Sequence, residues 1–134
     1  MNTTAGCPHP NWVLCVTTFR LVILAWNRPH SLARLLDSVT ATHWDWPASP
    51  DWDIVIDFQV DGGGGEQGEE VRRLVENFTF PVGRKVVRAH TENRGPVAAW
   101  RDAWTWRDRE MFIIVEDDAE LSSHWYPHCE TFIQ

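Results

Sequence analysis

Apolar and polar residues alternate along this chain in two periods, one typical of β-strands and one typical of amphipathic helices. Four strand-like runs are predicted: Phe19–Trp26, Asp53–Val60, Arg84–Ala89 and Met111–Val115. The first is almost continuously apolar, which is the pattern of a strand buried on both faces of a parallel sheet. The second alternates, so that Ile54, Ile56, Phe58 and Val60 share one face.

A helix-like segment follows each of the first three runs. The first has apolar residues at positions i, i+3, i+4 and i+7, and Ser31 is its candidate N-cap. These apolar residues are Leu32, Leu35, Leu36 and Val39. The second helix is predicted over Glu69–Phe78 by the same spacing. The third is predicted over Pro96–Arg107, with the proline near the first turn, where its missing N–H costs least.

This order of elements predicts the fold class. Strands that alternate with helices favour an α/β fold with an open, mostly parallel sheet, flanking helices and right-handed crossovers. Between the first helix and the second strand, the stretch Thr42–Asp51 contains Pro47 and Pro50. We expect a loop there, whose tryptophans pack onto the sheet edge or a neighbouring element.

Composition and charge exclude several classes of protein. The 134 residues suit one domain at most, and 43% hydrophobic with 23% charged residues argues against wholesale disorder. The net charge is −7 and no basic stripe is present, so nucleic acid is not an expected partner. The most apolar stretch, Trp12–Trp26, contains Arg20 and is too short to span a membrane. Cys7, Cys15 and Cys129 match neither a zinc site nor a disulfide framework, and we expect ordinary thiols.

Polar residues stand at the carboxyl end of every predicted strand. They are Asn27-Arg28, Asp61, His90 to Asn93 and the triplet Glu116-Asp117-Asp118. In open α/β sheets, ligands bind outside these strand ends, where loops and helix N-termini converge. Four polar groups at four equivalent ends therefore predict a binding site.

The acidic triplet has the sharpest chemistry. Three adjacent carboxylates repel one another unless they are solvated or face a cation. Mg²⁺ and Mn²⁺ prefer oxygen ligands, and such an ion could bridge one carboxylate to a diphosphate and neutralise charge on a leaving group. A solvated acidic turn is the alternative, but the triplet directly follows an apolar strand, which favours the metal interpretation.

Three other patterns are weaker. Gly63, Gly65 and Gly68 have the G-x-G-x-x-G spacing of a dinucleotide site, but Glu66 would stand where a pyrophosphate approaches, and a turn that clears space beside Asp61 is favoured. A second pattern, His124, His128 and Cys129, lacks a partner pair for zinc. The third comprises Trp100, Trp104 and Trp106, which we expect to form the buried stripe of a helix, with an aromatic platform for a sugar or base as the alternative.

Several of these motifs together resemble the GT-A-fold glycosyltransferases. The carrying residues are Leu21 to Pro29 with Ser31 to Leu36, then Val60-Asp61-Gly62, Asn93-Arg94-Gly95 with Ala99 to Trp104, and Phe112 to Asp118. The last matches the D-x-D position in its E-D-D form, which is similar to N-acetylglucosaminyltransferases of the glycan-branching class. The resemblance covers about residues 19 to 126, so we interpret 1–18 as an N-terminal extension and 19–134 as a nucleotide-sugar-binding portion.

The resemblance implies a role for each matching position. Asn27 and Arg28 would line the nucleotide pocket, and Asp61 would contact the base or ribose. Glu116 and Asp117 would approach the ribose and the sugar. Asp118 would hold the Mn²⁺ or Mg²⁺ that grips the diphosphate.

The resemblance also implies partners, a location and a missing part. A UDP-sugar would be the donor, and a glycan or glycoprotein would be the acceptor. The location would be the Golgi or another secretory compartment if a membrane anchor lies outside this chain, and the cytoplasm otherwise. In inverting members a carboxylate base well downstream of the metal motif activates the acceptor. Because 16 residues follow Asp118, we expect a truncated chain without that base.

Three functions therefore stay open. The favoured one is the donor-binding half of a metal-dependent glycosyltransferase. The second is a dinucleotide-binding domain that uses the glycine loop, and the third is a non-catalytic fragment.

Overall fold

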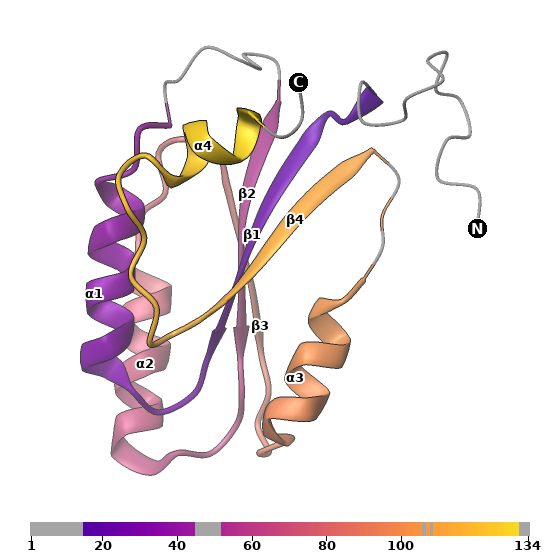
Figure 1. The fold of residues 1–134 in the computed structure, drawn as a ribbon. Helices are drawn as coiled ribbons and strands as arrows, with labels where there is room; N and C mark the ends of the chain where they lie inside the picture. Colours follow the sequence, from indigo (N-terminus) through magenta and orange to yellow (C-terminus); the bar gives the residue numbers. More distant parts are fainter. Residues whose placement is uncertain (1–14, 45–51, 106, 108, 132–134) are drawn as a thin grey trace.

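The chain folds around one four-stranded sheet in which all strands are parallel. The computed structural model describes residues 15–44, 52–105, 107 and 109–131 (Figure 1). The strands are β1 (Thr18–Ala25), β2 (Asp53–Val60), β3 (Arg84–Ala89) and β4 (Glu110–Glu116), in the spatial order β3-β2-β1-β4. The helices are α1 (Pro29–Thr40), α2 (Gly65–Asn77), α3 (Gly95–Ala103) and α4 (Trp125–Thr131). The predicted α/β class with an open parallel sheet is confirmed.

Helices cover both faces of the sheet. In Figure 1, α1 and α2 lie side by side on one face and α3 lies on the other. This division follows from the strand order, because the chain moves from β1 to β2 to β3 and then returns past β1 to β4. All crossover connections have the same hand, so connections that run in opposite directions along the sheet place their helices on opposite faces.

The α1/α2 face holds the main hydrophobic core. It contains the predicted stripe of α1 and the alternating residues of β2, which the structure buries together. Tyr126 of α4 completes this core, and Trp44 and Trp52 pack against it, as expected for that loop. Trp46 lies outside the described residues. The core is therefore built from the positions that the apolar periodicity picked out.

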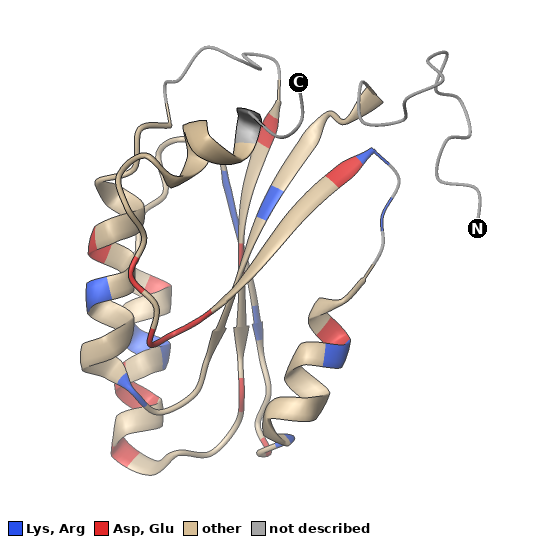
Figure 2. Ribbon diagram, in the orientation of Figure 1, with Lys and Arg blue, Asp and Glu red and all other residues tan. Residues whose placement is uncertain are grey.

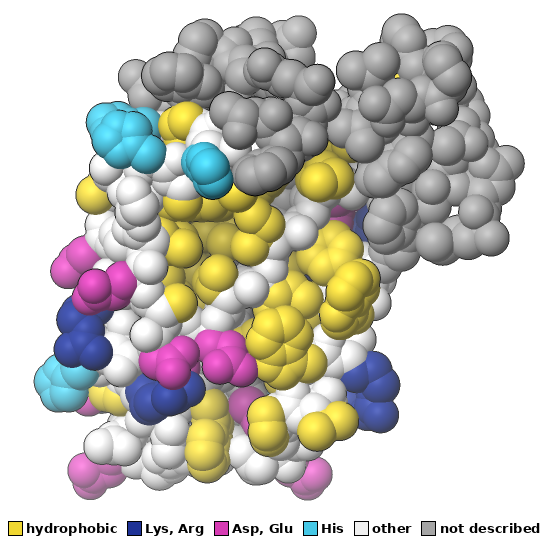
Figure 3. Space-filling view, in the orientation of Figure 1, with side chains coloured by type: hydrophobic (Ala, Val, Ile, Leu, Met, Phe, Trp, Pro, Cys, Tyr) yellow, Lys and Arg dark blue, Asp and Glu magenta, His cyan; other side chains and the backbone are white. Residues whose placement is uncertain are grey.

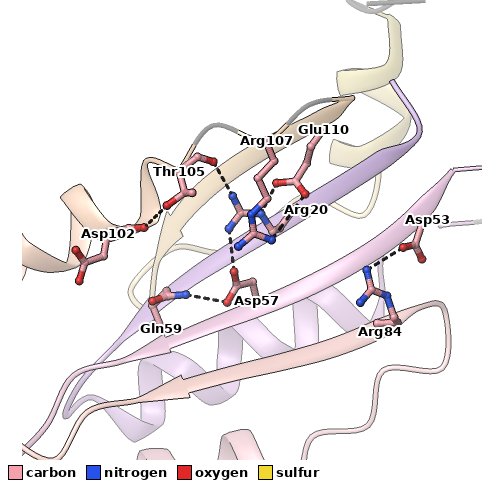
Figure 4. Close-up of polar contacts among 9 residues, drawn as sticks. All are labelled: Arg20, Asp53, Asp57, Gln59, Arg84, Asp102, Thr105, Arg107 and Glu110. Atoms are coloured by element: carbon pink, nitrogen blue, oxygen red, sulfur yellow. Dashed lines mark hydrogen bonds and ion pairs between the residues drawn. The ribbon is translucent and has the colours of Figure 1, made fainter. Parts of the chain in front are cut away.

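The opposite face carries a buried ionic group that the sequence did not predict. Arg20 of β1 is 2% exposed, and its guanidinium donates from Nε to Glu110 at 2.6 Å and from Nη1 to Asp57 at 2.8 Å. Its Nη2 donates to the carbonyl oxygen of Thr105 at 3.2 Å, and Gln59 donates to Asp57 at 2.8 Å (Figure 4). Figure 2 shows that basic and acidic positions occur within the strands of the sheet as well as on the helices. We name Arg20, Asp57, Gln59 and Glu110 the Arg20 group.

Helix boundaries depart from the predictions in three places. α1 begins at Pro29, with Arg28 as N-cap, so Ser31 lies inside the first turn and the N-cap prediction was wrong. Proline at N1 supplies the helical φ angle and needs no N–H partner, which starts the helix earlier. α2 begins at Gly65 rather than Glu69. α3 ends at Ala103 rather than Arg107, and Arg20 instead takes the Thr105 carbonyl beyond it.

Two further expectations need correction. Cys15 is disulfide-bonded, with a partner outside the described residues, whereas Cys129 carries the expected free thiol. Trp104 was expected in a buried stripe, but it is 66% exposed; Trp106 lies outside the described residues.

α4 was not predicted, because its seven residues include Pro127 and show no helical apolar period. Among the described residues, no helix has the length and apolar character needed to cross a membrane.

Candidate functional site

A cavity of about 520 Å³ opens at the carboxyl ends of β1, β2 and β4. It lies beside β1 and β4, where the strand order reverses, and this topological switch point is where open α/β sheets bind ligands. Asn27, Arg28, Asp61, Glu116 and Asp117 all line it. Asp118 does not line it but is bonded to Arg28, which does. The structure thus brings together the predicted site residues from three strand ends.

Strand register explains why these residues meet. Leu24 of β1 pairs with Glu116, and Ala25 pairs with Val60. The ladders then continue for one residue, because the Asp61 N–H donates to the Ala25 carbonyl at 2.9 Å and the Asp117 N–H donates to the Leu24 carbonyl at 3.0 Å. Asp61 and Asp117 therefore flank the end of β1 at one level.

Asp61 organises the loops on its side of the cavity. Its carboxylate accepts backbone N–H bonds from Gly62 at 2.8 Å, Arg94 at 2.8 Å and Gly95 at 3.0 Å, and an amide bond from Asn93 at 3.2 Å. A carboxylate at the first residues of α3 also complements the helix dipole. Asp61 thus fixes the start of α3, which forms one wall of the cavity, and this bonding was not visible in the sequence.

Arg28 pairs with two carboxylates of the acidic triplet, Asp117 and Asp118. Its Nη2 lies 2.6 Å from Asp117 Oδ1, and its Nη1 lies 3.5 Å from Asp118 Oδ2. Asp117 is buried, whereas the side chains of Arg28 and Asp118 are each 52% exposed. In Figure 3, acidic and basic side chains lie together where β4 ends, next to apolar side chains toward α3. One guanidinium therefore bridges two carboxylates at the cavity rim.

Burial shifts the pKa of the middle carboxylate, Asp117. Desolvation raises the pKa of Asp117 above its usual value, and the attraction of Arg28 and the backbone bond from Trp26 offset part of this increase. A perturbed carboxyl in a cavity is typical of functional sites, although structural ion pairs can perturb a carboxyl too.

The residues present fit a divalent cation that is shared with a ligand. Within the described ranges, no three His, Cys, Asp or Glu side chains gather as a metal centre. Mg²⁺ does not need such a centre, because it binds through one or two carboxylates together with substrate phosphates and water. Asp118 is exposed and only loosely bonded to Arg28, so its carboxylate can supply that protein ligand.

Two tryptophans, Trp26 and Trp100, form apolar walls of the cavity. The sequence offered a ligand-facing role for Trp100 only as the alternative to a buried stripe, and it assigned no such role to Trp26. Trp26 donates from Nε1 to the Gly62 carbonyl at 2.9 Å, and Trp100 donates from Nε1 to Glu116 Oε1 at 2.9 Å. Both indoles are held by their polar edges. Gln59 also lines the cavity, and strict alternation in β2 places it opposite the apolar face.

The glycine loop has a packing role. A Cβ on Gly62 would lie 2.4 Å from the Glu92 backbone, so glycine allows the β2–α2 and β3–α3 loops to approach. A Cβ on Gly68 would lie 2.2 Å from the Gly63 carbonyl oxygen. None of Gly63, Gly65 and Gly68 lines the cavity. The glycines of the turn beside Asp61 thus allow close packing behind the cavity wall and do not themselves line the cavity.

Two other polar groups lie apart from the main cavity wall. In the first group, the guanidinium of Arg94 is bonded to Asp102 and lies 3.3 Å from His90 Nε2. This group lies behind Asp61. At the other end of the sheet, His124 packs against His43 with ring centroids 4.6 Å apart. In the described part of the chain, His124, His128 and Cys129 do not gather as a group that could hold a metal ion.

No protein-family model matches the sequence, and no curated protein matches it either.

Proposed function

We propose that this chain is the nucleotide-sugar-binding portion of a metal-dependent glycosyltransferase, with a UDP-sugar as donor and a glycan or other hydroxyl as acceptor. One observation carries the proposal: the cavity at the switch point brings together polar side chains from β1, β2 and β4, with an exposed carboxylate at its rim. These features suit a nucleoside diphosphate. It needs a pocket for the base and ribose, and it needs an anionic group that holds a cation against the phosphates.

Each residue has a distinct task in this proposal. Asn27 and Asp61 face the base and ribose, and Asp61 also fixes the start of α3. Glu116 and Asp117 lie toward the ribose and the sugar. Arg28 is close enough to the triplet to pair with a phosphate of the donor, since a guanidinium fork suits phosphate oxygens.

Asp118 would hold the divalent cation. When bound, Mn²⁺ or Mg²⁺ would neutralise the charge that develops on the leaving nucleoside diphosphate. The protein's part is to present one exposed carboxylate, to keep Asp117 and Arg28 beside it, and to bind the nucleoside in a preformed pocket. The proposal concerns donor binding and assigns no residue of this chain as the catalytic base.

Thermal unfolding with uridine diphosphate, with and without Mn²⁺, tests the proposal. At a ligand concentration of 100 times Kd, binding stabilises the folded state by about 2.7 kcal/mol, which is a readily measured rise in Tm. We expect this rise to need both additions, and we expect Asp118→Ala to abolish the part that depends on Mn²⁺.

Glu120→Ala is the matched control for this variant. Glu120 is an exposed acid two residues away, paired with Arg34 at 3.6 Å and outside the cavity lining. Its removal should leave the response unchanged. A folded wild-type protein that shows no rise with any uridine nucleotide and Mn²⁺ would contradict the proposal, as would an equal loss in both variants.

A further inference from the structure

We propose that Trp100 is a positioning residue that holds Glu116 for the sugar of the donor, so that Trp100 sets the preference for a nucleotide-sugar over the bare nucleotide. This inference rests on the proposed function, because it assumes a nucleotide-sugar in the cavity. It adds a residue and a selectivity that the donor proposal does not contain.

The first support is the contact itself. The indole Nε1–H of Trp100, on α3, donates to Glu116 Oε1, at the end of β4, over 2.9 Å. Both residues line the cavity, Trp100 from α3 and Glu116 from the end of β4. A hydrogen bond to a carboxylate is stronger than one between neutral groups. This bond therefore connects the α3 wall to the acidic triplet.

The second support is a difference between the two side chains. Packing holds the indole of Trp100 in place, whereas the carboxylate of Glu116 has no such packing. The Trp100 ring packs on the small apolar cluster of Val22, Leu24 and Ala103. Glu116 is exposed, and its flexible side chain would otherwise lose substantial rotamer entropy on binding a ligand. The bond from Trp100 supplies that order in advance, and preorganisation of this kind improves affinity.

The held carboxylate keeps free capacity for a ligand. An ionised carboxylate has about four lone-pair sites, and the Trp100 bond uses one of them. Sugar hydroxyls are donors that can use the others, whereas uridine diphosphate has no sugar at this position. The contribution of Trp100 should therefore be felt with the sugar and not with the nucleotide alone.

Trp104 is the natural control on the same segment. It follows directly after α3, is 66% exposed, and its ring contacts Phe112 with centroids 5.4 Å apart. It does not line the cavity. A Trp104→Phe variant makes the same chemical change without touching Glu116.

The experiment compares UDP-N-acetylglucosamine with uridine diphosphate by titration calorimetry in the presence of Mn²⁺. Trp100→Phe removes the N–H and keeps an aromatic ring. We expect it to weaken binding of the nucleotide-sugar about tenfold, as for loss of one hydrogen bond to a charged group, and to change uridine diphosphate less than about twofold. Trp104→Phe should change neither.

A double variant separates positioning from packing. If Trp100 acts through Glu116, the variant carrying both Trp100→Phe and Glu116→Gln binds the nucleotide-sugar no more weakly than Glu116→Gln alone. Equal weakening of both ligands by Trp100→Phe, or additive effects in the double variant, would overturn the inference. If Trp100→Phe does not fold, Glu116→Gln alone must lose the same selectivity, and unchanged selectivity overturns it. A wild-type protein that binds neither ligand contradicts the proposed function instead.

Discussion

The two faces of the sheet are built in opposite ways. The face under α1 and α2 is apolar, with complementary stripes from helices and strands packed into one core. The face under α3 has a small apolar cluster of Val22, Leu24 and Ala103, the buried Arg20 group, and the cavity. Apolar burial stabilises a fold in proportion to area, whereas buried charges gain little net free energy even when paired. One face therefore carries most of the stability, and the other carries the chemistry.

The largest expected loss of stability comes from the apolar face. Phe58 is fully buried in the main core and contacts the ring of Phe78. Phe58→Ala leaves a cavity and should lower the free energy of unfolding by about 3–5 kcal/mol, measured by urea denaturation. Val87→Ala, at a site 41% exposed on β3, is the control and should cost within about 0.5 kcal/mol. Similar losses at both sites would mean that the apolar face does not dominate.

The next largest loss of stability is expected at Arg20, on the polar face, which is the face under α3. Arg20→Met leaves Asp57 and Glu110 buried and deprives them of their shared cation, which should cost about 3 kcal/mol. Replacing all three residues by apolar residues of similar volume should recover most of the loss, because no charge is then buried unpaired. Denaturation of both variants checks this. If the triple variant is no more stable than Arg20→Met, the Arg20 group contributes through specific bonds rather than through mutual neutralisation.

The same contrast explains what the sequence could predict. Apolar periodicity depends on local spacing, so it identified the strands, the stripe of α1 and the alternating residues of β2. The last two meet in the main core. The rule that ligands bind at strand ends placed Asn27, Asp61 and Glu116 together before any contact was known. These successes share a cause, since both depend on where each element begins and ends, which the local spacing of apolar residues shows.

The errors share a cause too. In the sequence, Arg20 interrupts an apolar strand. Its burial depends on Asp57 and Glu110, which are 37 and 90 residues away along the chain. Trp100 and Trp104 have the same spacing as core residues, but α3 ends before Trp104 and leaves it exposed. Partners that are distant in sequence decide these positions, and no local pattern reports them.

A smaller effect is expected where a charge supports the apolar face from its rim. Lys85 of β3 donates from Nζ to the carbonyl oxygens of Val75 at 2.8 Å, Glu76 at 2.9 Å and Phe78 at 2.9 Å, at the end of α2. Lys85→Met removes these bonds and a favourable charge at the helix C-terminus, and should cost about 1–2 kcal/mol in urea denaturation. Arg88→Met, an exposed change on the same strand, should cost within about 0.5 kcal/mol. Equal costs would contradict a capping role for Lys85.

The smallest expected change in stability has the opposite sign and belongs to the site. Burial raises the pKa of Asp117 above that of an unfolded aspartate, about 3.9, despite Arg28. Between those two pKa values the folded state binds more protons, so the free energy of unfolding falls as pH rises through that window, and the loss is complete above the folded pKa.

Asp117→Asn removes this titration. In buffer with a metal chelator, the variant should be slightly more stable than the wild type at pH 7 and should lack the fall in stability above pH 4, as measured by urea denaturation at a series of pH values. It should also lose affinity for uridine diphosphate with Mn²⁺, because the carboxylate no longer holds Arg28 beside the rim. A variant that is less stable than the wild type at pH 7 would show that the Arg28 pair outweighs desolvation. The polar face would then contribute to stability as well as to binding, and the contrast between the two faces would be weaker than the structure indicates.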